Sequence, residues 1–550
     1  MTIRKILTLL LLAAGSMNAF SSEPPKLVSS EPPKLVITIL VDQLRYDYLE
    51  RFHDQFSEGG FRLLMDNGAF LTDAHYNYMP TITGPGHASF LSGAPPAVHG
   101  IISNQWFDHR TGGNVNCVSD PSVKGVGADG ADGQRSPRNF TGSTLADEMR
   151  LRFHSKVIGV SHKDRGAILP AGKKPAGAYW FHSGSGNFIT STYYRQELPE
   201  WVKEFNGRKL PAQFIGQTWK RLLDPSFYQW PDDATGERKL AGDDKVTFDH
   251  RVVASEKEGF ETIIPTPFGN QLLLEFALAA LEGEKLGTST HPDLLCVSFS
   301  SNDYVGHASG PYSQEVQDIT LRLDLQLNEF FKQVDQKIGL ENVYIVLTAD
   351  HGVAPTPEFA AEQGLDGYRV DPVEQMRDLL GKLGKQFGPG QYLQTPRIVD
   401  GNLYFNHGAL RKMNVSEDDV ADFIREWALA SGNYQAAYSR RQLLEGLAPG
   451  EIGRRVVNGY NAERSGDVVL VLKPFVLLSG SDSGTTHGSP YAYDTHIPVF
   501  FYGSGFHPGR YSDEFSITDI AATLCAALRM NEPSGSIGKP LVKALADQTR

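Results

Sequence analysis

Four short apolar runs along the chain end in polar residues of a kind often found in active sites. The runs cover residues 34–41, 156–161, 293–299 and 343–348, and each is rich in Val, Ile or Leu. Helical spacing of apolar residues lies between them, at 143–153, 270–283 and 314–337. Near-continuous apolar strands that alternate with helices are typical of parallel sheets covered on both faces. The pattern predicts an α/β fold with a mostly parallel central sheet and helices on both faces.

Two stretches interrupt this alternation. Residues 166–265 are rich in aromatic residues, Pro and Gly, without a clear strand and helix rhythm. Residues 356–480 have strand and helix patterns of their own, including a helix capped by Ser416, and an apolar run at 496–503 resumes the core. We therefore expect one catalytic domain over residues 34–545, with insertions at about 166–265 and 356–480 that form cap subdomains.

The N-terminus has the layout of a secretory signal peptide. Arg4 and Lys5 precede a short apolar run, and small residues follow it. The run is too short to cross a bilayer, and no other apolar run reaches membrane length. We predict a signal peptide at 1–20, a linker at 21–33 that carries a duplicated SSEPPKLV octapeptide, and a secreted or periplasmic protein without a membrane span.

Charge and cysteine content exclude several classes of protein. The formal net charge is −12 and there is no long basic block, which argues against nucleic acid as a specific partner. Cys117, Cys296 and Cys525 show no CxxC spacing, so neither a zinc ribbon nor a disulfide framework is indicated. Whether one pair forms a disulfide is left open, as is the oligomeric state.

Carboxylates and imidazoles gather at or after the predicted strand ends. This mixture of oxygen and nitrogen ligands suits zinc, whereas calcium and magnesium prefer oxygen ligands alone. A single Asp at a strand end is usually a cap or a turn residue, but the whole set is much more specific. Six ligands suit two ions with three ligands each. The set comprises Asp42, Asp303, His307, Asp350, His351 and His487.

Two metal ions about 3.5–4 Å apart can stabilise both the attacking and the leaving oxygen of an in-line displacement, which suits phosphoryl or sulfuryl transfer. Three of the four hydroxyl groups in the segment PTITGPGHASFLSG at 80–93, those of Thr81, Thr83 and Ser89, are candidates for the nucleophile. Thr83 is favoured over Thr81 and Ser89, because it precedes Gly84-Pro85 and is expected at the N-cap of a helix. Free N–H groups at such a helix end attract phosphate.

These motifs resemble the alkaline phosphatase superfamily, and in particular the secreted bacterial alkaline phosphatases with a threonine nucleophile. Those enzymes are relatives of the nucleotide pyrophosphatase/phosphodiesterases. The resemblance covers most of the chain after residue 34. Its motifs are VDQLRYDYLERF, PTITGPGHASFLSGAPPAVHGIISNQWFD, SHKDRG, SSNDYVGH, TADHG and THGSPYAYDTHIP.

The resemblance implies a role for each matching residue. One Zn²⁺ would be held by Asp42, Asp350 and His351, with Thr83 as its fourth ligand and as the nucleophile. The second Zn²⁺ would be held by Asp303, His307 and His487. Substrate oxygens would be bound by Asn104, Lys163 and Arg165.

The activity implied is hydrolysis of a broad range of phosphate monoesters through a covalent phosphothreonine. A phosphodiesterase or nucleotide pyrophosphatase on the same scaffold is the alternative, and the Lys163–Arg165 pair favours the more highly charged monoester. Sulfatase chemistry is excluded, because the oxidised cysteine of the C-x-P-x-R pattern is replaced by Thr83 and its arginine by His87. A binding protein without catalytic activity would be a third class, but no metal ligand is missing.

Overall fold

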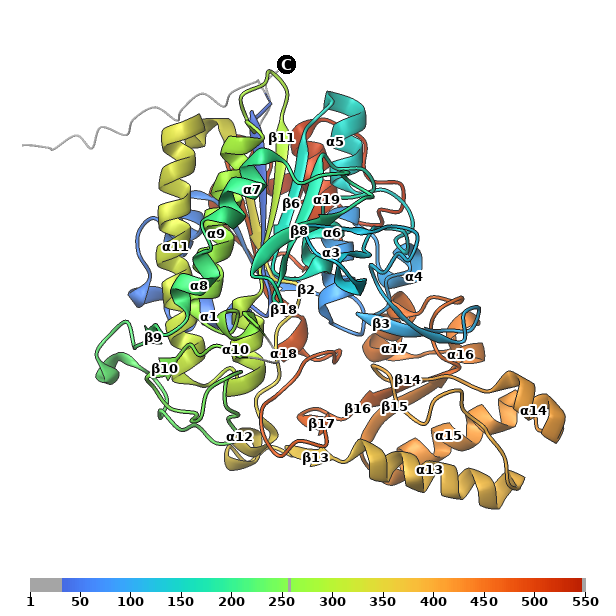
Figure 1. Ribbon diagram of the computed structural model, residues 1–550. Helices are drawn as coiled ribbons and strands as arrows, with labels where there is room; N and C mark the ends of the chain where they lie inside the picture. Colours follow the sequence, from blue (N-terminus) through green and yellow to red (C-terminus); the bar gives the residue numbers. More distant parts are fainter. Residues whose placement is uncertain (1–31, 256–258, 547–550) are drawn as a thin grey trace, which may run out of the picture.

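The computed structural model describes residues 32–255 and 259–546 (Figure 1). The predicted signal peptide at 1–20 and the linker up to residue 31 lie outside the described residues. Within the described ranges, no helix combines the length and apolarity needed to cross a bilayer.

An 11-stranded mixed sheet forms the centre of the structure. The block β12-β1-β11-β6-β7 is parallel throughout, whereas β18 and β8 flank this block in antiparallel pairings. The predicted α/β fold with a mostly parallel central sheet is therefore confirmed. In spatial order the strands are β19 (Gly509–Tyr511), β2 (Ala69–His75), β18 (His496–Tyr502), β12 (Val343–Thr348), β1 (Leu35–Val41), β11 (Asp293–Phe299), β6 (Val157–Ser161), β7 (Gly177–His182), β8 (Asn187–Ser191) and β5 (Gly125–Val126), with β20 (Phe515–Ser516) also paired to β2.

Helices cover both faces of this sheet, as the apolar pattern predicts. Figure 1 shows α9 (Pro267–Gly283) and α11 (Gln314–Ile338) on one face, and α5 (Leu145–Phe153), α6 (Asp164–Ile168) and α19 (Asp519–Leu528) on the other. The helices expected at 143–153, 270–283 and 314–337 are α5, α9 and α11.

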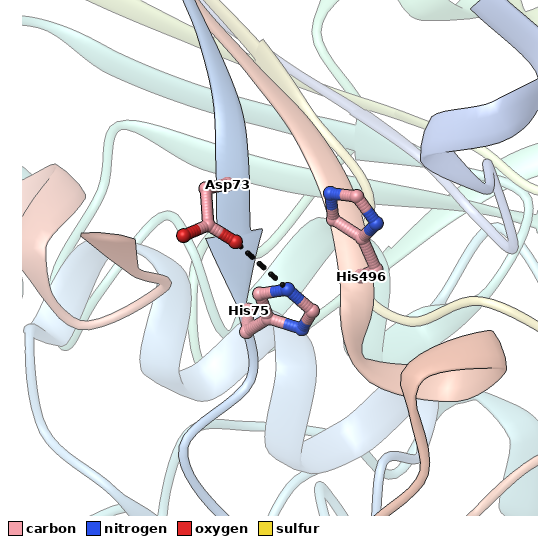
Figure 2. A group of neighbouring side chains, drawn as sticks. All are labelled: Asp73, His75 and His496. Carbon is pink, nitrogen blue, oxygen red and sulfur yellow. Dashed lines mark ion pairs between the residues drawn. The ribbon is translucent and has the colours of Figure 1, made fainter. Parts of the chain in front are cut away.

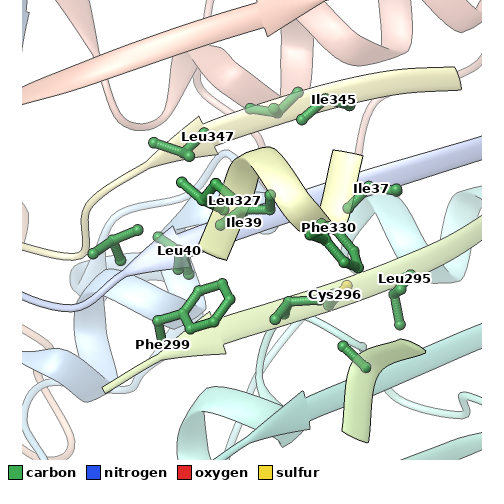
Figure 3. Close-up of a cluster of buried hydrophobic side chains, with 14 of the residues drawn as sticks. Ile37, Ile39, Leu40, Leu295, Cys296, Phe299, Leu327, Phe330, Ile345 and Leu347 are labelled. Carbon is green, nitrogen blue, oxygen red and sulfur yellow. The ribbon is translucent and has the colours of Figure 1, made fainter. Parts of the chain in front are cut away.

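The core is built where α11 packs on the central strands. All seven residues of β1 are buried. Figure 3 shows Leu327 and Phe330 of α11, three residues apart and thus on one helix face, packed over the β1 residues Ile37 and Ile39. Because β1 is apolar on both faces, it is held in the middle of the sheet and its carboxyl end is fixed in place.

The region at 166–265 is only partly an insertion. Its first third contains β7 and β8, which belong to the central sheet, so the stretch up to Ser191 is core. Aromatic residues such as Tyr179 and Phe181 concealed these strands, yet their side chains pack within the main core. The remainder contains α7 (Glu200–Gly207), α8 (Leu210–Phe214) and the short pair β9 (Thr218–Trp219) and β10 (His250–Arg251).

Residues 356–480, called the cap below, have an apolar core of their own. A three-stranded antiparallel sheet of β14 (Asn402–Leu403), β16 (Val468–Leu472) and β15 (Tyr434–Ser439) packs with α13 (Pro372–Phe387) and α15 (Glu417–Ser431). The Ser416 hydroxyl accepts from the N–H of Asp419 (3.4 Å), as expected of an N-cap. The cap, orange in Figure 1, contacts the core domain where Met79 N donates to Arg455 O (3.0 Å).

Candidate active site

Carboxylates follow three parallel strands and lie at one edge of the sheet. Asp42 directly follows β1, Asp303 lies in the first turn of α10 (Ser301–Ser309) after β11, and Asp350 and His351 follow β12. Since β11 and β12 flank β1 in parallel, their carboxyl ends meet at the same edge. This edge is where open α/β sheets bind ligands.

Asp303, His307 and His487 form one group of potential metal ligands. His307 follows Asp303 by one helical turn, and its Nε2 lies 3.2 Å from Asp303 Oδ1. His487 Nε2 approaches the same oxygen at 3.7 Å. One ligand atom of each residue lies within 4.8 Å of the others. The structure thus brings together the three residues that the resemblance assigns to one ion.

A second group lies beside the first. His351 Nε2 is 3.3 Å from Asp42 Oδ1 and 3.5 Å from Asp350 Oδ2. Asp303 is also within 4.8 Å of Asp42 and His351, so the two groups are contiguous. Thr83 Oγ1 lies 3.4 Å from His351 Nε2. All seven predicted ligands therefore gather in one cluster, although their segments are up to 445 positions apart (487 − 42).

The three histidines share one orientation. In each of them Nδ1 lies within hydrogen-bond distance of a backbone carbonyl. An Nδ1–H that donates to a carbonyl leaves Nε2 with its lone pair turned toward the cluster, which is the usual arrangement of a histidine that binds metal. The pairs are His307 with Thr485 O (2.9 Å), His351 with Gly352 O (2.9 Å) and His487 with Thr81 O (2.7 Å).

The carboxylates at the centre of the cluster fit a cationic partner. Burial and the neighbouring Asp42 raise the pKa of Asp350 well above its usual value. Burial also acts to raise the pKa of Asp42 and Asp303. The positive charge of Lys163 and of nearby histidines lowers these two pKa values by more, so both lie below normal. Asp42 Oδ1 and Asp350 Oδ2 are buried without a hydrogen-bond partner within the described part of the chain. The mixed nitrogen and oxygen donor set suits zinc.

Thr83 is the first residue of α3 (Thr83–Ser92), which corrects its expected place at the N-cap. The cap is Ile82, whose extended backbone (φ −132°, ψ 153°) precedes the first helical residue. The shift by one position keeps Thr83 at the helix N-terminus. A glycine is required at position 86 of the same helix, because the backbone of Asp350 comes so close that a Cβ there would collide with Asp350 O.

The hydroxyls of the other two candidates, Thr81 and Ser89, are engaged elsewhere. Thr81 Oγ1 donates to Ser489 O (2.9 Å), and Ser89 lies inside α3 against His99 Nε2 (3.0 Å). His87 is held within the helix by Thr83 O at 2.8 Å. Of the three candidate hydroxyls, only that of Thr83 borders the ligand cluster.

Two of the residues expected to bind substrate contact the start of α3 or the carboxylates of the cluster. Asn104 Oδ1 accepts from Gly84 N (2.8 Å), which fixes the carboxamide at the N-terminus of α3. Lys163 Nζ is paired with Asp303 (2.7 Å) and with Asp42, so its charge lies among the carboxylates. Arg165 lies in the first turn of α6, and its buried Nε has no hydrogen-bond partner in the described ranges.

Gln43 was missed by sequence reasoning. Its backbone lies in the left-handed region (φ 66°), which is uncommon for a residue other than glycine. Its N–H donates to Asp350 Oδ1 (3.1 Å) and its Nε2 donates to Asp303 Oδ1 (2.8 Å). Gln43 thus links a carboxylate of each group. A polar residue directly after Asp42 was the only signal for it in the sequence.

Asp494 was also missed, and it orders the loop that carries His487. Its Oδ2 accepts from Gly488 N (3.1 Å), Ser489 N (2.8 Å) and Ser489 Oγ (2.6 Å). Burial raises its pKa to about 6. The YDTHIP motif contains this Asp, but its partner loop is visible only in the fold.

The parallel sheet and the cluster at its edge define an α/β protein with a group of candidate metal ligands beside the strand ends. The family model of type I phosphodiesterase / nucleotide pyrophosphatase matches residues 36–494. The chain belongs to this family.

Relatives of known name match over nearly the whole chain. Alkaline phosphatase PafA of Elizabethkingia meningoseptica is 38% identical over 517 residues, which is 93% of this chain and 94% of PafA. Alkaline phosphatase PhoV of Synechococcus elongatus is 38% identical over 516 residues, with 93% and 92% covered. The crystal structure of wild-type PafA superimposes with a TM-score of 0.89, and covers 94% of this chain and 99% of that chain.

Proposed function

We propose that this protein is an exported, zinc-dependent alkaline phosphatase that hydrolyses phosphate monoesters, with Thr83 as the nucleophile. The observation that carries the proposal is the position of Thr83 Oγ1 at the start of α3, 3.4 Å from His351 Nε2 and beside the buried carboxylates. Two relatives that are 38% identical over more than nine-tenths of the chain bear the name alkaline phosphatase, which supports the reaction class.

Two Zn²⁺ ions are the cofactors that the donor set fits best. Asp42, Asp350 and His351 would hold one ion next to Thr83, and Asp303, His307 and His487 would hold the other. Two such ions, when bound, would lower the pKa of the Thr83 hydroxyl and stabilise negative charge on the leaving oxygen.

The protein's own residues then perform two displacements. Thr83 Oγ attacks phosphorus, the bond from phosphorus to the ester oxygen breaks, and the alcohol leaves with a proton. Water then attacks the phosphothreonine, the bond to Thr83 Oγ breaks, and phosphate is released. Thr83 is the first residue of α3, and the positive end of the helix dipole there favours an anion.

Asn104, Lys163 and Arg165 would orient the phosphoryl group. Gly84 N–H occupies Asn104 Oδ1, which leaves the amide N–H groups of Asn104 available for a phosphoryl oxygen. The two cations favour a monoester, because a monoester carries one more negative charge than a diester. This preference is the physical basis for choosing phosphatase over phosphodiesterase.

Replacing Thr83 by Ala tests the proposal. We expect Thr83→Ala to lower turnover of an aryl phosphate by at least about 10³-fold, since the nucleophile is removed. Thr83→Ser should retain activity and form a phosphoserine that acid quenching and mass spectrometry detect at position 83. Ser92→Ala is the matched control, because Ser92 is a buried hydroxyl at the far end of α3. Near-wild-type turnover in Thr83→Ala would refute the nucleophile assignment.

One observation favours the alternative, a phosphodiesterase. A largely apolar pocket of about 210 Å³ lies beside Ile82 and His487, and Tyr434 and Leu470 of the cap also line it. Such a pocket could accept the second ester group of a diester, or the leaving group of a monoester.

Comparing an aryl phosphate with its methyl diester decides between the two. In a phosphatase, the double variant Lys163→Ala/Arg165→Ala should lose far more monoester than diester activity. Lys174→Ala removes an exposed cation nearby in sequence and serves as the control. Equal losses on both substrates, with the diester turned over faster by the wild type, would favour the phosphodiesterase.

A further inference from the structure

A second meeting point of histidines and carboxylates shares no residue with the cluster at Thr83 and lies where a core-domain hairpin touches the cap. The hairpin is β3 (Gln105–Asp108) and β4 (Gly113–Asn116), and His109 lies in its turn. The ring centroids of His109 and His407 are 5.2 Å apart, and Phe107 packs against Tyr404 at 5.7 Å. His407 begins α14 (His407–Met413) of the cap.

Three side chains at this contact could bind one metal ion. His109, His407 and Asp467 each offer a ligand atom, and these atoms lie within 4.8 Å of one another. His407 Nε2 is 3.6 Å from Asp467 Oδ1. Ligands of a tetrahedral zinc, with bonds of about 2.1 Å, lie about 3.4 Å apart, so small side-chain rotations would complete the site.

Neighbouring groups already orient two of the three ligands. His407 Nδ1 lies 2.8 Å from Glu417 Oε1, so an Nδ1–H donated to Glu417 turns the Nε2 lone pair toward Asp467. Asp467 Oδ2 accepts from Phe405 N (2.7 Å), which leaves Oδ1 facing His407. Metal-binding histidines commonly donate their second ring N–H to a carboxylate, as His407 would to Glu417.

The burial of Asp467 also favours a cation at this contact. Asp467 is only 7% exposed, and burial raises the pKa of its carboxyl. A divalent ion would offset the cost of keeping this carboxylate charged. His109 is exposed at the tip of the hairpin, so an ion has a path from solvent.

A similar group elsewhere lacks this orientation. Figure 2 shows Asp73 and His75 on β2 next to His496 on β18, with an ion pair between His75 and Asp73. His496 Nε2 lies 3.0 Å from Thr72 O, so it donates to a carbonyl. The rings of His75 and His496 are stacked at 4.5 Å with 13° between their planes.

We propose that His109, His407 and Asp467 bind an additional divalent transition-metal ion of the zinc type, which joins the β3–β4 hairpin to the cap. Imidazole and carboxylate ligands select zinc or cobalt over calcium and magnesium, and three protein ligands leave one position for water. The site is separate from the cluster at Thr83, and its test requires no catalysis.

Zinc analysis of the protein, after equilibration with Zn²⁺ and removal of unbound ion, tests the number of sites. The wild type should bind one more ion per chain than His109→Gln or His407→Gln. His291→Gln, which removes an exposed histidine away from the site, should bind as many ions as the wild type. Equal stoichiometry in the wild type and His109→Gln would overturn the proposal, as would loss of the additional ion in His75→Gln alone.

Two variants that each remove one negative charge test whether the contact of Glu417 with His407 supports metal binding. Glu417 and Asp418 are adjacent carboxylates at the start of α15, but only Glu417 contacts His407, whereas Asp418 pairs with Arg441 (2.9 Å). Glu417→Gln should weaken Zn²⁺ binding at this site by about 10-fold or more, and Asp418→Asn should not change it. Equal effects of the two variants would indicate a general charge effect and would contradict the proposed geometry.

Discussion

Removal of the Asn104 carboxamide should lower kcat/KM for a phosphate monoester without disturbing the fold. In the structure Gly84 N–H donates to Asn104 Oδ1 (2.8 Å), so the side chain is held with its amide group beside the start of α3. A hydrogen bond to a charged oxygen contributes about 1.5–3 kcal/mol. Since each 1.36 kcal/mol changes a rate tenfold, Asn104→Ala should reduce kcat/KM by roughly 10- to 160-fold.

Steady-state kinetics on an aryl phosphate, with zinc content and melting temperature measured alongside, checks this value. Asn104→Asp keeps the acceptor for Gly84 N–H but places a carboxylate where a donor is expected, so its loss should exceed that of Asn104→Ala. Gln105→Ala changes the next, exposed side chain and should leave kcat/KM unchanged. If Asn104→Ala stayed within twofold of the wild type, or Asn104→Asp were fully active, the assignment of Asn104 to substrate binding would be wrong.

Three further predictions concern stability and metal. Burial and Glu315 raise the pKa of Glu237 from 4.5 to about 10, so the folded protein keeps a proton that the unfolded chain releases above pH 4.5. Stability should therefore fall as pH rises from 4.5 toward 10, and the melting temperature of Glu237→Gln should exceed that of the wild type by more at pH 9 than at pH 4.5; a constant difference would contradict this. Phe276 stacks on Phe188 at 3.7 Å in the core, and Phe276→Ala should cost about 3–5 kcal/mol of unfolding free energy in urea, with a loss below 1 kcal/mol refuting tight packing there. Chelation should abolish phosphatase activity and lower the melting temperature, because Asp350 and its neighbours would lose their cations, and Zn²⁺ should restore both better than Mg²⁺; activity that persists in protein shown to be free of metal would exclude the proposed cofactors.

Much of the site was accessible from sequence because its residues follow apolar strands directly. Asp42 comes after β1 and Asp350 after β12, and parallel strands place such residues at one edge by simple geometry. Asp303 and His307 are four positions apart, and the structure places them one helical turn apart on α10. These inferences depend on local patterns, and local patterns are visible in the sequence.

The tertiary structure alone decided which distant segments meet. β7 and β8 belong to the central sheet because β7 pairs with β6, a contact that no local composition reveals. Gln43 reaches carboxylates of both groups only through a left-handed turn that the surrounding fold maintains. His109 and Asp467 are 358 positions apart (467 − 109), and they meet because the cap folds around its own core and docks on the hairpin.

The difference between what the sequence determined and what required the structure has a physical cause. Apolar periodicity and strand-end polarity follow from which side chains each segment must bury, so the sequence determined the fold class and most residues of the ligand cluster. Strand pairing, cap docking and the exact start of α3 depend on burial summed over the whole chain, so they required the three-dimensional structure. Thr83 illustrates both: its sequence placed it at a helix start, and the fold placed its hydroxyl next to His351.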